Sequence, residues 1–331
     1  MALLTIIMPV YNASAFIKEA VESILNQTFQ DFELWIVDDA STDDSISIAK
    51  SFQDSRIRFF SNTTNLGRIR TANSRVKEIS SPYFTVTDAD DVSHPQRLEK
   101  QIRFLESNSD CLMCGTAFWV MNDHGFLFRE IKLLTDVEEM RRAALLQSQF
   151  LGASTVMRKS VLDYFPEFYR EYISDNFADA DLDCMILDKF NATNINEPLY
   201  FYRIVRTSIT RKKITVRSLN LNKLVGFLSK QRREQGQDCL QRGLPQEADE
   251  FMNSVQKEYD KDPSFFFRHQ AFVHLYWGVH DLAFQNGLKA FFARPLYLKN
   301  LLSLGLIVFR IGVFLLTRGV NKKHYAQLMN Q

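Results

Sequence analysis

The chain has 331 residues, of which 46% are apolar and 24% charged, a composition typical of a globular protein and not of a disordered one. Forty Lys and Arg against thirty-nine Asp and Glu leave a formal net charge of +1, which excludes a uniformly basic, nucleic-acid-binding protein. Four cysteines in a chain of this length do not form a disulfide scaffold, so we expect a reducing, cytoplasmic location.

The first half of the chain alternates between short apolar runs and helical patterns. Leu3–Met8 predicts a strand buried on both faces instead of a signal peptide, because no basic region precedes it and no cleavage site follows it. Asn12 and Ser14 can cap the helix that follows, and Pro95 takes the favoured first position of a later helix. Further strands are expected at Phe32–Val37, Ile57–Ser61, Tyr83–Thr87 and Cys111–Ala117, and further helices at Asp43–Phe52 and Ile69–Ile79. This alternation predicts an α/β fold, a mostly parallel sheet with helices on both faces.

The second half of the chain lacks strand-like runs after about Phe201. Helical stretches replace them, at Leu219–Gln231, Gln246–Tyr259 and Phe265–Phe292. We therefore expect a domain boundary between residues 205 and 215, followed by a mainly helical region at residues 211–331.

An apolar block near the end of the chain predicts a further helix, near residues 299–317. From Leu301 to Thr317 its only charge is Arg310. This length is at the lower limit for crossing a bilayer, and a central Arg costs about 2.5 to 3.5 kcal/mol on insertion scales. Three arrangements stay open: a helix in the membrane interface, a core helix and a spanning helix. In the first, Arg310 would reach the headgroups, and three more basic residues would lie near them. These are Arg318, Lys322 and Lys323.

The near-zero net charge conceals two halves of opposite sign. Residues 1–205 carry 20 basic and 30 acidic side chains, whereas residues 206–331 carry 20 and 9. An acidic first half fits carboxylates that hold a cation, and a basic tail fits attraction to anionic lipid headgroups. A solvated helical face is the alternative explanation of the tail.

Two acidic clusters stand at the ends of predicted strands, where parallel sheets bind their ligands. Asp38-Asp39 ends the second strand, and Asp88-Ala89-Asp90-Asp91 ends the fourth. Because side chains alternate in an extended chain, Asp88 and Asp90 can project into one cleft, while Asp91 would face away from Asp90. Two carboxylates so close repel each other unless a cation lies between them, and oxygen ligands suit Mg²⁺ or Mn²⁺. A solvated turn is the alternative for this motif alone.

Other motifs accompany these clusters along the chain. Pro9-Val10-Tyr11-Asn12 follows the first strand, Asn65-Leu66-Gly67 precedes the third helix, and Pro95-Gln96-Arg97-Leu98 follows the second acidic cluster. With these motifs the chain resembles the family 2 glycosyltransferases, inverting enzymes with the GT-A fold. The resemblance covers residues 1–210 and implies that they form a catalytic domain that binds a nucleotide sugar.

The resemblance also implies roles for single residues. Asp39 would contact the nucleotide base, since a carboxylate can accept a hydrogen bond from the imide N–H of a pyrimidine. Pro9 and Tyr11 would line the same wall, Asp88 would approach the ribose, and Asp90 would bind the metal ion on the diphosphate.

Arg68, Arg70 and Asp38 each have an alternative to a role in nucleotide binding. Arg68 and Arg70 follow the Asn-Leu-Gly turn and could reach the base or the diphosphate, because the planar guanidinium pairs well with phosphate oxygens. A solvated helix face is the alternative for both. Asp38 is better explained as a cap or turn residue than as a ligand of the nucleotide.

An inverting transfer needs a base on the face opposite the leaving group. The family supplies it from a Glu-Asp pair before an apolar helix, and here Asp179 takes the place of the base while Ala178 replaces the Glu. Asp181 and Asp183 are the competing candidates, although either could instead be an acid placed favourably near the helix N-terminus.

A second departure follows in Tyr202-Arg203-Ile204-Val205. Val205 stands where family members often have a His that approaches the metal. The metal would then depend more on Asp90, and Arg203 and Arg206 could supply positive charge instead.

Together these features predict a metal-dependent inverting glycosyltransferase with Mn²⁺ or Mg²⁺ as its cofactor. It would move a sugar from a UDP- or dTDP-type donor to a hydroxyl group of a glycan or lipid-linked acceptor in cell-surface polysaccharide assembly. We expect it in the cytoplasm, in peripheral contact with the inner face of the plasma membrane. The alternatives are a non-catalytic relative that binds nucleotide sugars and a nucleotidyltransferase, although no basic Gly-rich loop follows the first strand.

Overall fold

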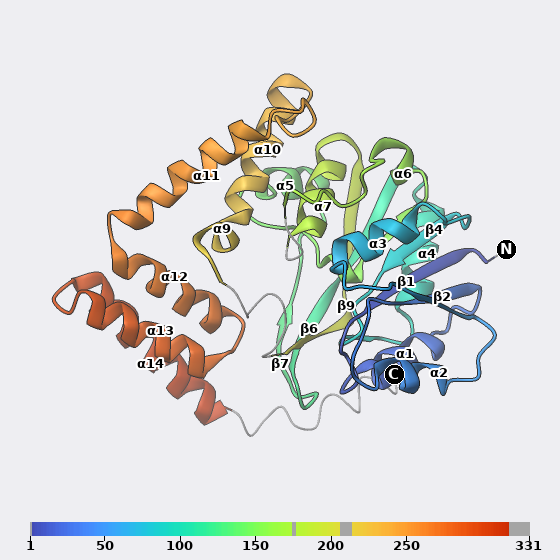
Figure 1. The fold of residues 1–331 in the computed structure, drawn as a ribbon, viewed down its shortest axis with the longest axis horizontal. Helices are drawn as coiled ribbons and strands as arrows, with labels where there is room; N and C mark the ends of the chain where they lie inside the picture. Colours follow the sequence, from blue (N-terminus) through green and yellow to red (C-terminus); the bar gives the residue numbers. More distant parts are fainter. Residues whose placement is uncertain (1, 174–176, 206–213, 318–331) are drawn as a thin grey trace. The chain divides into compact units, whose positions relative to one another are not determined.

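The computed structural model describes residues 2–173, 177–205 and 214–317 (Figure 1). Contacts between residues divide the described chain into two compact units, with the division after Val205. The first unit contains every strand of the described chain, and the second consists of helices.

A single nine-stranded sheet forms the centre of the first unit. Its strands are β1 (Leu4–Val10), β2 (Phe32–Asp38), β3 (Ile57–Ser61), β4 (Tyr83–Val86), β5 (Val92–Ser93), β6 (Cys111–Asn122), β7 (Leu127–Ile131), β8 (Val156–Arg158) and β9 (Asn191–Ile204). Their order is β3-β2-β1-β4-β8-β6-β9-β5, and β7 pairs with β6.

The first four strands in this order form the parallel part of the sheet. β1 pairs in parallel with β2 and β4, and β2 with β3. The apolar runs of β1, β2 and β4 fit this position, because a strand covered by helices on both faces is largely buried, whereas β3 at the end of the order is partly exposed. The other half is mixed: β8 runs antiparallel to β4 and β6, whereas β6 and β9 are parallel. The predicted parallel arrangement therefore holds for the part of the sheet that is built from β1, β2, β3 and β4.

Helices and one short 3₁₀-helix connect these strands. They are α1 (Ile17–Leu25), α2 (Ser45–Lys50), α3 (Arg68–Val76), α4 (Arg97–Ser107), α5 (Val137–Ala143), the 3₁₀-helix η1 (Gly152–Ser154), α6 (Val161–Tyr164) and α7 (Ala178–Lys189). Buried apolar residues of α1 and α4 share one core with Leu4, Ile6 and Met8, the alternate residues of β1. Helices thus cover the strands whose ends carry the acidic clusters.

Two predicted helix starts are wrong in detail. Asn12 and Ser14 do not cap α1, which begins after Phe16 without a side-chain cap. Asn12 has a positive φ of 51°, and its side-chain oxygen accepts a hydrogen bond from the backbone N–H of Thr42 at 2.8 Å, so it connects two loops instead. Pro95 lies in the turn before α4 and not in its first turn.

The second unit contains six described helices. They are α9 (Val216–Leu219), α10 (Leu221–Gln235), α11 (Pro245–Asp260), α12 (Pro263–Tyr276), α13 (His280–Ala293) and α14 (Leu298–Thr317). The last three share a small core, in which Ala271, Ala283 and Ile307 are fully buried. At Gly287 a Cβ atom would lie 3.0 Å from Ile307 Cδ1, so the absence of a side chain lets α13 approach α14 closely.

Asn300 connects these three helices through buried hydrogen bonds. Its amide nitrogen donates to the carbonyl oxygens of Ala290 and Arg294 at 2.8 and 3.1 Å. Its side-chain oxygen accepts from the guanidinium of Arg268 and lies 3.2 Å from the hydroxyl of Ser264, both in α12. The side chain therefore fixes the start of α14.

We expect Asn300→Ala to lower the free energy of unfolding by about 1 to 3 kcal/mol, because the buried partners of Asn300 lose their hydrogen bonds. Urea denaturation monitored by circular dichroism measures this change. Asn253→Ala on exposed α11 surface is the matched control and should change stability by less than about 0.5 kcal/mol. Equal effects of both substitutions would contradict the assigned role of Asn300.

Candidate active site

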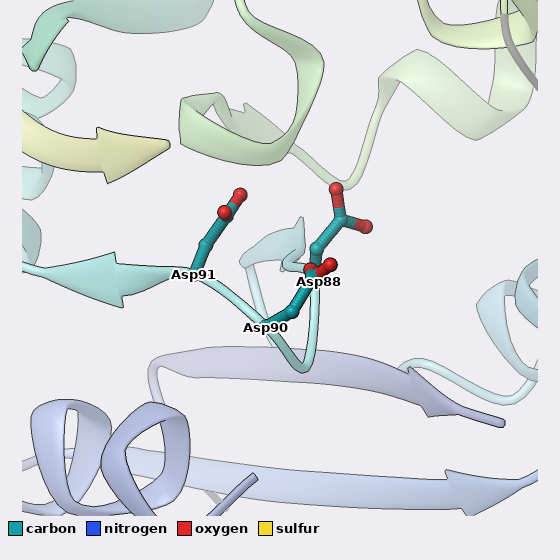
Figure 2. A group of neighbouring side chains, drawn as sticks. All are labelled: Asp88, Asp90 and Asp91. Carbon is teal, nitrogen blue, oxygen red and sulfur yellow. The ribbon is translucent and has the colours of Figure 1, made fainter. Parts of the chain in front are cut away.

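Three carboxylates lie together in the loop between β4 and β5. Asp88, Asp90 and Asp91 each offer an oxygen atom within 4.8 Å of the other two (Figure 2). The expectation that Asp91 faces away from Asp90 is wrong. Alternation holds only for an extended chain, and here the backbone turns at Ala89 and Asp90.

Asp91 is the buried member of this cluster, with only 2% of the residue exposed. One of its oxygens accepts a hydrogen bond from the backbone N–H of Arg203 at 2.7 Å, and its Oδ2 has no hydrogen-bond partner among the described residues. Burial, followed by the negative charges of Asp90 and Asp88, raises the pKa of Asp91 well above its ordinary value. A buried oxygen without a partner is unusual in a folded protein, and a bound ion or water molecule is one physical explanation of it.

Asp90 has an environment of the same kind. Burial and the charge of Asp88 raise the pKa of Asp90 to about 6, although the positive charges of Arg203 and Arg68 oppose the shift. Arg203 also donates a hydrogen bond from Nε to the backbone oxygen of Asp90 at 2.7 Å. Its guanidinium pairs with Glu19 as well, so Arg203 links the acidic loop to α1.

This donor set fits a divalent cation. Three carboxylates within one small volume repel one another, and a cation between them would remove that repulsion. Oxygen donors of this kind match Mg²⁺ and Mn²⁺. Two observations in the structure agree with such a site: the raised pKa of Asp90, and the Oδ2 of Asp91, for which the described residues provide no hydrogen-bond donor.

Asp39 organises the turn that leads into α3. Its carboxylate accepts hydrogen bonds from the Asn62 side chain at 2.8 Å and from the backbone N–H groups of Leu66 and Gly67, both at 2.9 Å. The side chain is only 3% exposed. Gly67 has a φ of 85°, a conformation that favours glycine, so residue type and hydrogen bonding agree at this turn. Contact between Asp39 and a nucleotide base stays a prediction.

The other residues of this edge follow β1 and β2. Pro9 lies in β1 opposite Val37, and Tyr11 comes directly after the strand with its side chain exposed. The backbone N–H of Asp39 donates to the carbonyl oxygen of Val10 at 2.8 Å, which brings the ends of both strands together. Asp38 accepts a hydrogen bond from the backbone N–H of Ser41 at 2.9 Å, as expected of a turn residue.

Arg68 lies between carboxylates from two distant segments. Its Nε donates to Asp88 Oδ1 at 2.9 Å, and its Nη1 is 3.9 Å from Asp179 Oδ2. The guanidinium also lies over the ring of Tyr169, 5.9 Å from its centre. Arg70 instead forms an exposed ion pair with Glu171, so the structure brings only the first of the two arginines to the acidic cluster.

Asp179 stands in the first turn of α7. Its Oδ1 accepts a hydrogen bond from the backbone N–H of Ala180 at 2.8 Å. Burial raises the pKa of Asp179, and the charge of Arg68 opposes this shift. Ala178, which replaces the Glu of the family motif, is fully buried.

The two competing acids of α7 have different environments. Asp181 is buried and binds Arg170 in a bidentate ion pair, with distances of 2.6 and 2.5 Å. Asp183 is also buried, and neither of its oxygens has a hydrogen-bond partner among the described residues. Burial and then the charge of Asp179 raise the pKa of Asp183 well above its ordinary value, which favours the neutral acid. Asp179 is therefore the one acid of the three that contacts the acidic cluster through Arg68.

Gly152 and Tyr169 complete the surroundings of Asp179, and no sequence motif indicated either residue. A Cβ atom at Gly152 would lie 2.5 Å from both Cβ and Oδ2 of Asp179, so the glycine provides the space for this carboxylate. Tyr169 is buried and lies close enough for its pKa to respond to Arg68, Asp179 and Asp183. Neither residue belongs to a recognisable motif, and only the tertiary fold brings them to α7. Of the remaining sequence expectations, Arg206 lies outside the described residues.

Known glycosyltransferases are similar to this chain over much of its length. The family described as glycosyl transferase family 2 matches residues 5–165. An uncharacterized glycosyltransferase from Haemophilus influenzae is 32% identical over 219 residues, which cover 64% of this chain and 84% of that protein. The O-antigen biosynthesis glycosyltransferase WbnJ of Escherichia coli is 28% identical over 248 residues, covering 72% of this chain and 94% of WbnJ.

Solved structures resemble the chain over more of its length. S. aureus TarS in complex with UDP-GlcNAc has a TM-score of 0.55 at 16% identity, covering 93% of this chain and 92% of that one. The mannosyltransferase PcManGT from Pyrobaculum calidifontis, in complex with GDP-Man and Mn²⁺, has a TM-score of 0.51 at 14% identity, covering 99% and 83%. At such identities the likeness concerns the fold, and it confirms the predicted α/β fold of GT-A type with its C-terminal helices.

We expect Gly152→Ala to lower the free energy of unfolding by about 1 to 3 kcal/mol, because the new methyl group must displace Asp179 or the backbone of η1. Thermal and urea denaturation measure the change. Gly305→Ala in α14 adds the same methyl group in open space and should be neutral or slightly stabilising. A neutral Gly152→Ala would show that the Asp179 carboxylate has more room than the structure gives it.

Proposed function

The chain belongs to glycosyl transferase family 2, and from this premise we propose that it is a metal-dependent inverting glycosyltransferase. The membership confirms the resemblance found in the sequence, and with it that the protein is a glycosyltransferase enzyme of glycan biosynthesis. One observation carries the proposal: Arg68 lies between the Asp88-Asp90-Asp91 cluster and Asp179.

We propose that the donor is a nucleoside diphosphate sugar with a pyrimidine base, of UDP or dTDP type. TarS and PcManGT bind UDP-GlcNAc and GDP-Man respectively, which supports the class of donor but not the base. Asp39 is the residue that would read a pyrimidine. A carboxylate has about four acceptor positions, and three are occupied within the protein, so one remains for an imide N–H. Pro9 and Tyr11 would line the same wall.

Asp90, with Asp88 and Asp91 beside it, would hold Mn²⁺ or Mg²⁺. A divalent cation supplies positive charge that stabilises the negative charge developing on a leaving diphosphate. Asp88 would in addition approach the ribose of the donor. The Mn²⁺ in the PcManGT complex supports the choice of metal for a protein of this fold.

Asp179 would accept the proton of the attacking hydroxyl group. Burial raises the pKa of Asp179 and so makes it a stronger base than an ordinary aspartate. Asp181 is held in its ion pair with Arg170, and Asp183 favours the neutral form, so neither is suited to this task. The replacement of the family Glu by Ala178 leaves the base itself in place.

Arg68 would bind the diphosphate from the side of Asp179. A guanidinium has five N–H donors, and contacts with Asp88 and Asp179 leave several of them for phosphate oxygens. The phosphate would then compete with Asp179 for Arg68. Because the charge of Arg68 lowers the pKa of Asp179, donor binding would raise the basicity of Asp179 when the acceptor arrives. Arg70 has an exposed partner, Glu171, and would need to leave it to reach a nucleotide.

The relatives support a biological setting for the proposed reaction. The O-antigen biosynthesis role in the name of WbnJ supports assembly of a cell-surface polysaccharide, with a glycan or a lipid-linked molecule as the acceptor. We propose that the enzyme works in the cytoplasm, close to the inner face of the plasma membrane, where lipid-linked acceptors are found.

We expect Asp179→Asn to lower kcat for hydrolysis of the preferred nucleotide sugar by about 10²- to 10⁴-fold, because the amide cannot accept the proton. The donor KM should change by less than about threefold. Chromatographic measurement of the released nucleoside diphosphate checks both values.

Asp183→Asn is the matched control on the same helix and should leave kcat within about threefold, since Asp183 already favours the neutral form. If this control instead loses activity while Asp179→Asn keeps it, the base must be reassigned to Asp183. If no nucleotide sugar is hydrolysed or stabilises the wild type, the chain is a non-catalytic relative.

The metal response should depend on pH. With Mn²⁺ and UDP we expect Tm to rise by about 2 to 5 °C at pH 7.5. The pKa of Asp90 is about 6, so protonation of this ligand should weaken metal binding and reduce the shift at pH 5. Differential scanning fluorimetry at both pH values measures this change in Tm.

Asp90→Asn should abolish the Mn²⁺-dependent shift, whereas Asp123→Asn, at an exposed acid, should retain it. An unchanged shift in Asp90→Asn would overturn the assignment of Asp90 as a metal ligand.

A further inference from the structure

The last described helix exposes a continuous apolar surface. We call this surface the apolar face of α14. It is formed by side chains that are each at least 42% exposed, namely Leu298, Leu301, Leu302, Leu306, Val308, Phe309, Val313 and Leu315. Phe309 is 65% exposed, an unusual position for a large aromatic side chain in a folded protein. An exposed apolar patch of this extent normally marks a binding surface.

The opposite side of α14 is packed within its own unit. Ile307 is fully buried against α12 and α13, and Asn300 is buried in hydrogen bonds with the same helices. The helix is thus attached along its side to a layer of two other helices. Those helices expose polar side chains, among them Asp281, Gln285 and Lys289 of α13.

The charged residues of the sequence that follows Asp281 are all basic, although one of them, Arg294, is ion-paired with Asp262. After Asp281 the sequence contains no Asp or Glu up to residue 331, although it contains seven basic residues. These are Lys289, Arg294, Lys299, Arg310, Arg318, Lys322 and Lys323, of which the last three lie outside the described residues. Lys299 and Arg310 are exposed on α14 itself. An apolar surface with a cationic surround is complementary to an anionic lipid surface.

We propose that the apolar face of α14 lies in the interface of an anionic membrane, with the helix axis parallel to the membrane plane. Leu302, Leu306 and Phe309 would enter the acyl region. Lys299 and Arg310 would reach lipid phosphates through their long side chains. The proposal specifies the surface behind the proposed peripheral location and does not depend on the proposed roles in catalysis.

A spanning orientation agrees less well with the structure. The segment Leu298–Leu315 is long and apolar enough to cross a bilayer by length and composition, with a mean hydropathy of 1.8. Spanning would, however, carry the attached helix α13 into the bilayer with Asp281 and Lys289 exposed on its surface. It would also place Arg310 within the hydrocarbon region.

A second copy of the chain is also a poorer partner. In a symmetric dimer built on this face, the same surface would meet itself. The basic residues of one copy would then face those of the other, and the segment after Asp281 has no acid to pair with them.

The test is sedimentation of the full chain with phosphatidylcholine vesicles that contain or lack 30% phosphatidylglycerol. We expect at least tenfold tighter binding to the anionic vesicles, weakened by salt. The double variant Leu306→Ser with Phe309→Ser should bind the anionic vesicles at least about tenfold more weakly than the wild type does. The matched control, Phe59→Ser with Leu146→Ser, removes exposed apolar side chains of the first unit and should bind as the wild type does.

Other outcomes would overturn the proposal in distinguishable ways. Equal binding of the double variant and the wild type would exclude the apolar face of α14. A wild-type dimer in light scattering that the double variant dissociates, without binding of either protein to vesicles, would assign the face to a second copy. Wild-type chain that stays in cell membranes after carbonate extraction would indicate a spanning helix. Hydrolysis of nucleotide sugar without membranes should be equal in wild type and double variant, which separates this test from that of the catalytic proposal.

Discussion

The position of the Arg68 guanidinium between two carboxylates is the constraint on which the candidate site depends. Asp88 and Asp179 come from distant parts of the chain, and each is brought to the same positive charge, at 2.9 and 3.9 Å. In a partly buried site, where water screens charges poorly, these acids would otherwise oppose each other's ionisation. The negative charge of Asp88 does raise the pKa of Asp179, and Arg68 lowers it. The acidic cluster and Asp179 therefore form one electrostatic system.

Environment separates acids that look equivalent in the sequence. Asp179, Asp181 and Asp183 alternate along a few residues of α7. The first lies beside Arg68, the second is paired with Arg170, and the third is buried without a hydrogen-bond partner in the described part of the chain. Acids with different surroundings can hold different protonation states at one pH, which is how an active site obtains distinct roles from one residue type. Such a division requires long-range contacts, because all three positions have similar local sequence.

The features that could be predicted from the sequence are those that depend on local patterns of residues. Continuous apolar runs marked β1 and β2, since strands covered on both faces need no polar alternation, and the acids after such strands marked the binding edge. Prediction failed where the backbone leaves regular geometry: the turn at Ala89 and Asp90 brings Asp91 into the cluster. It also missed Gly152, whose importance arises only because α7 packs against it. All the predicted roles stay predictions: nucleotide binding by Pro9, Tyr11, Asp39, Arg68, Arg70 and Asp88, metal binding by Asp90, and the role of Asp179 as the base.

The hydrogen bonds of Asp39 have a consequence for how its variants must be interpreted. Three of its acceptor positions hold the turn from Asn62 to Gly67, and that turn leads directly into the helix that carries Arg68. An Asp39 variant would thus loosen the helix start as well as remove the group that we propose to read the base. Weaker donor binding alone could not tell these two causes apart. A change in selectivity between pyrimidine and purine donors would indicate lost recognition of the base. A displaced Arg68 would instead weaken the binding of every diphosphate equally.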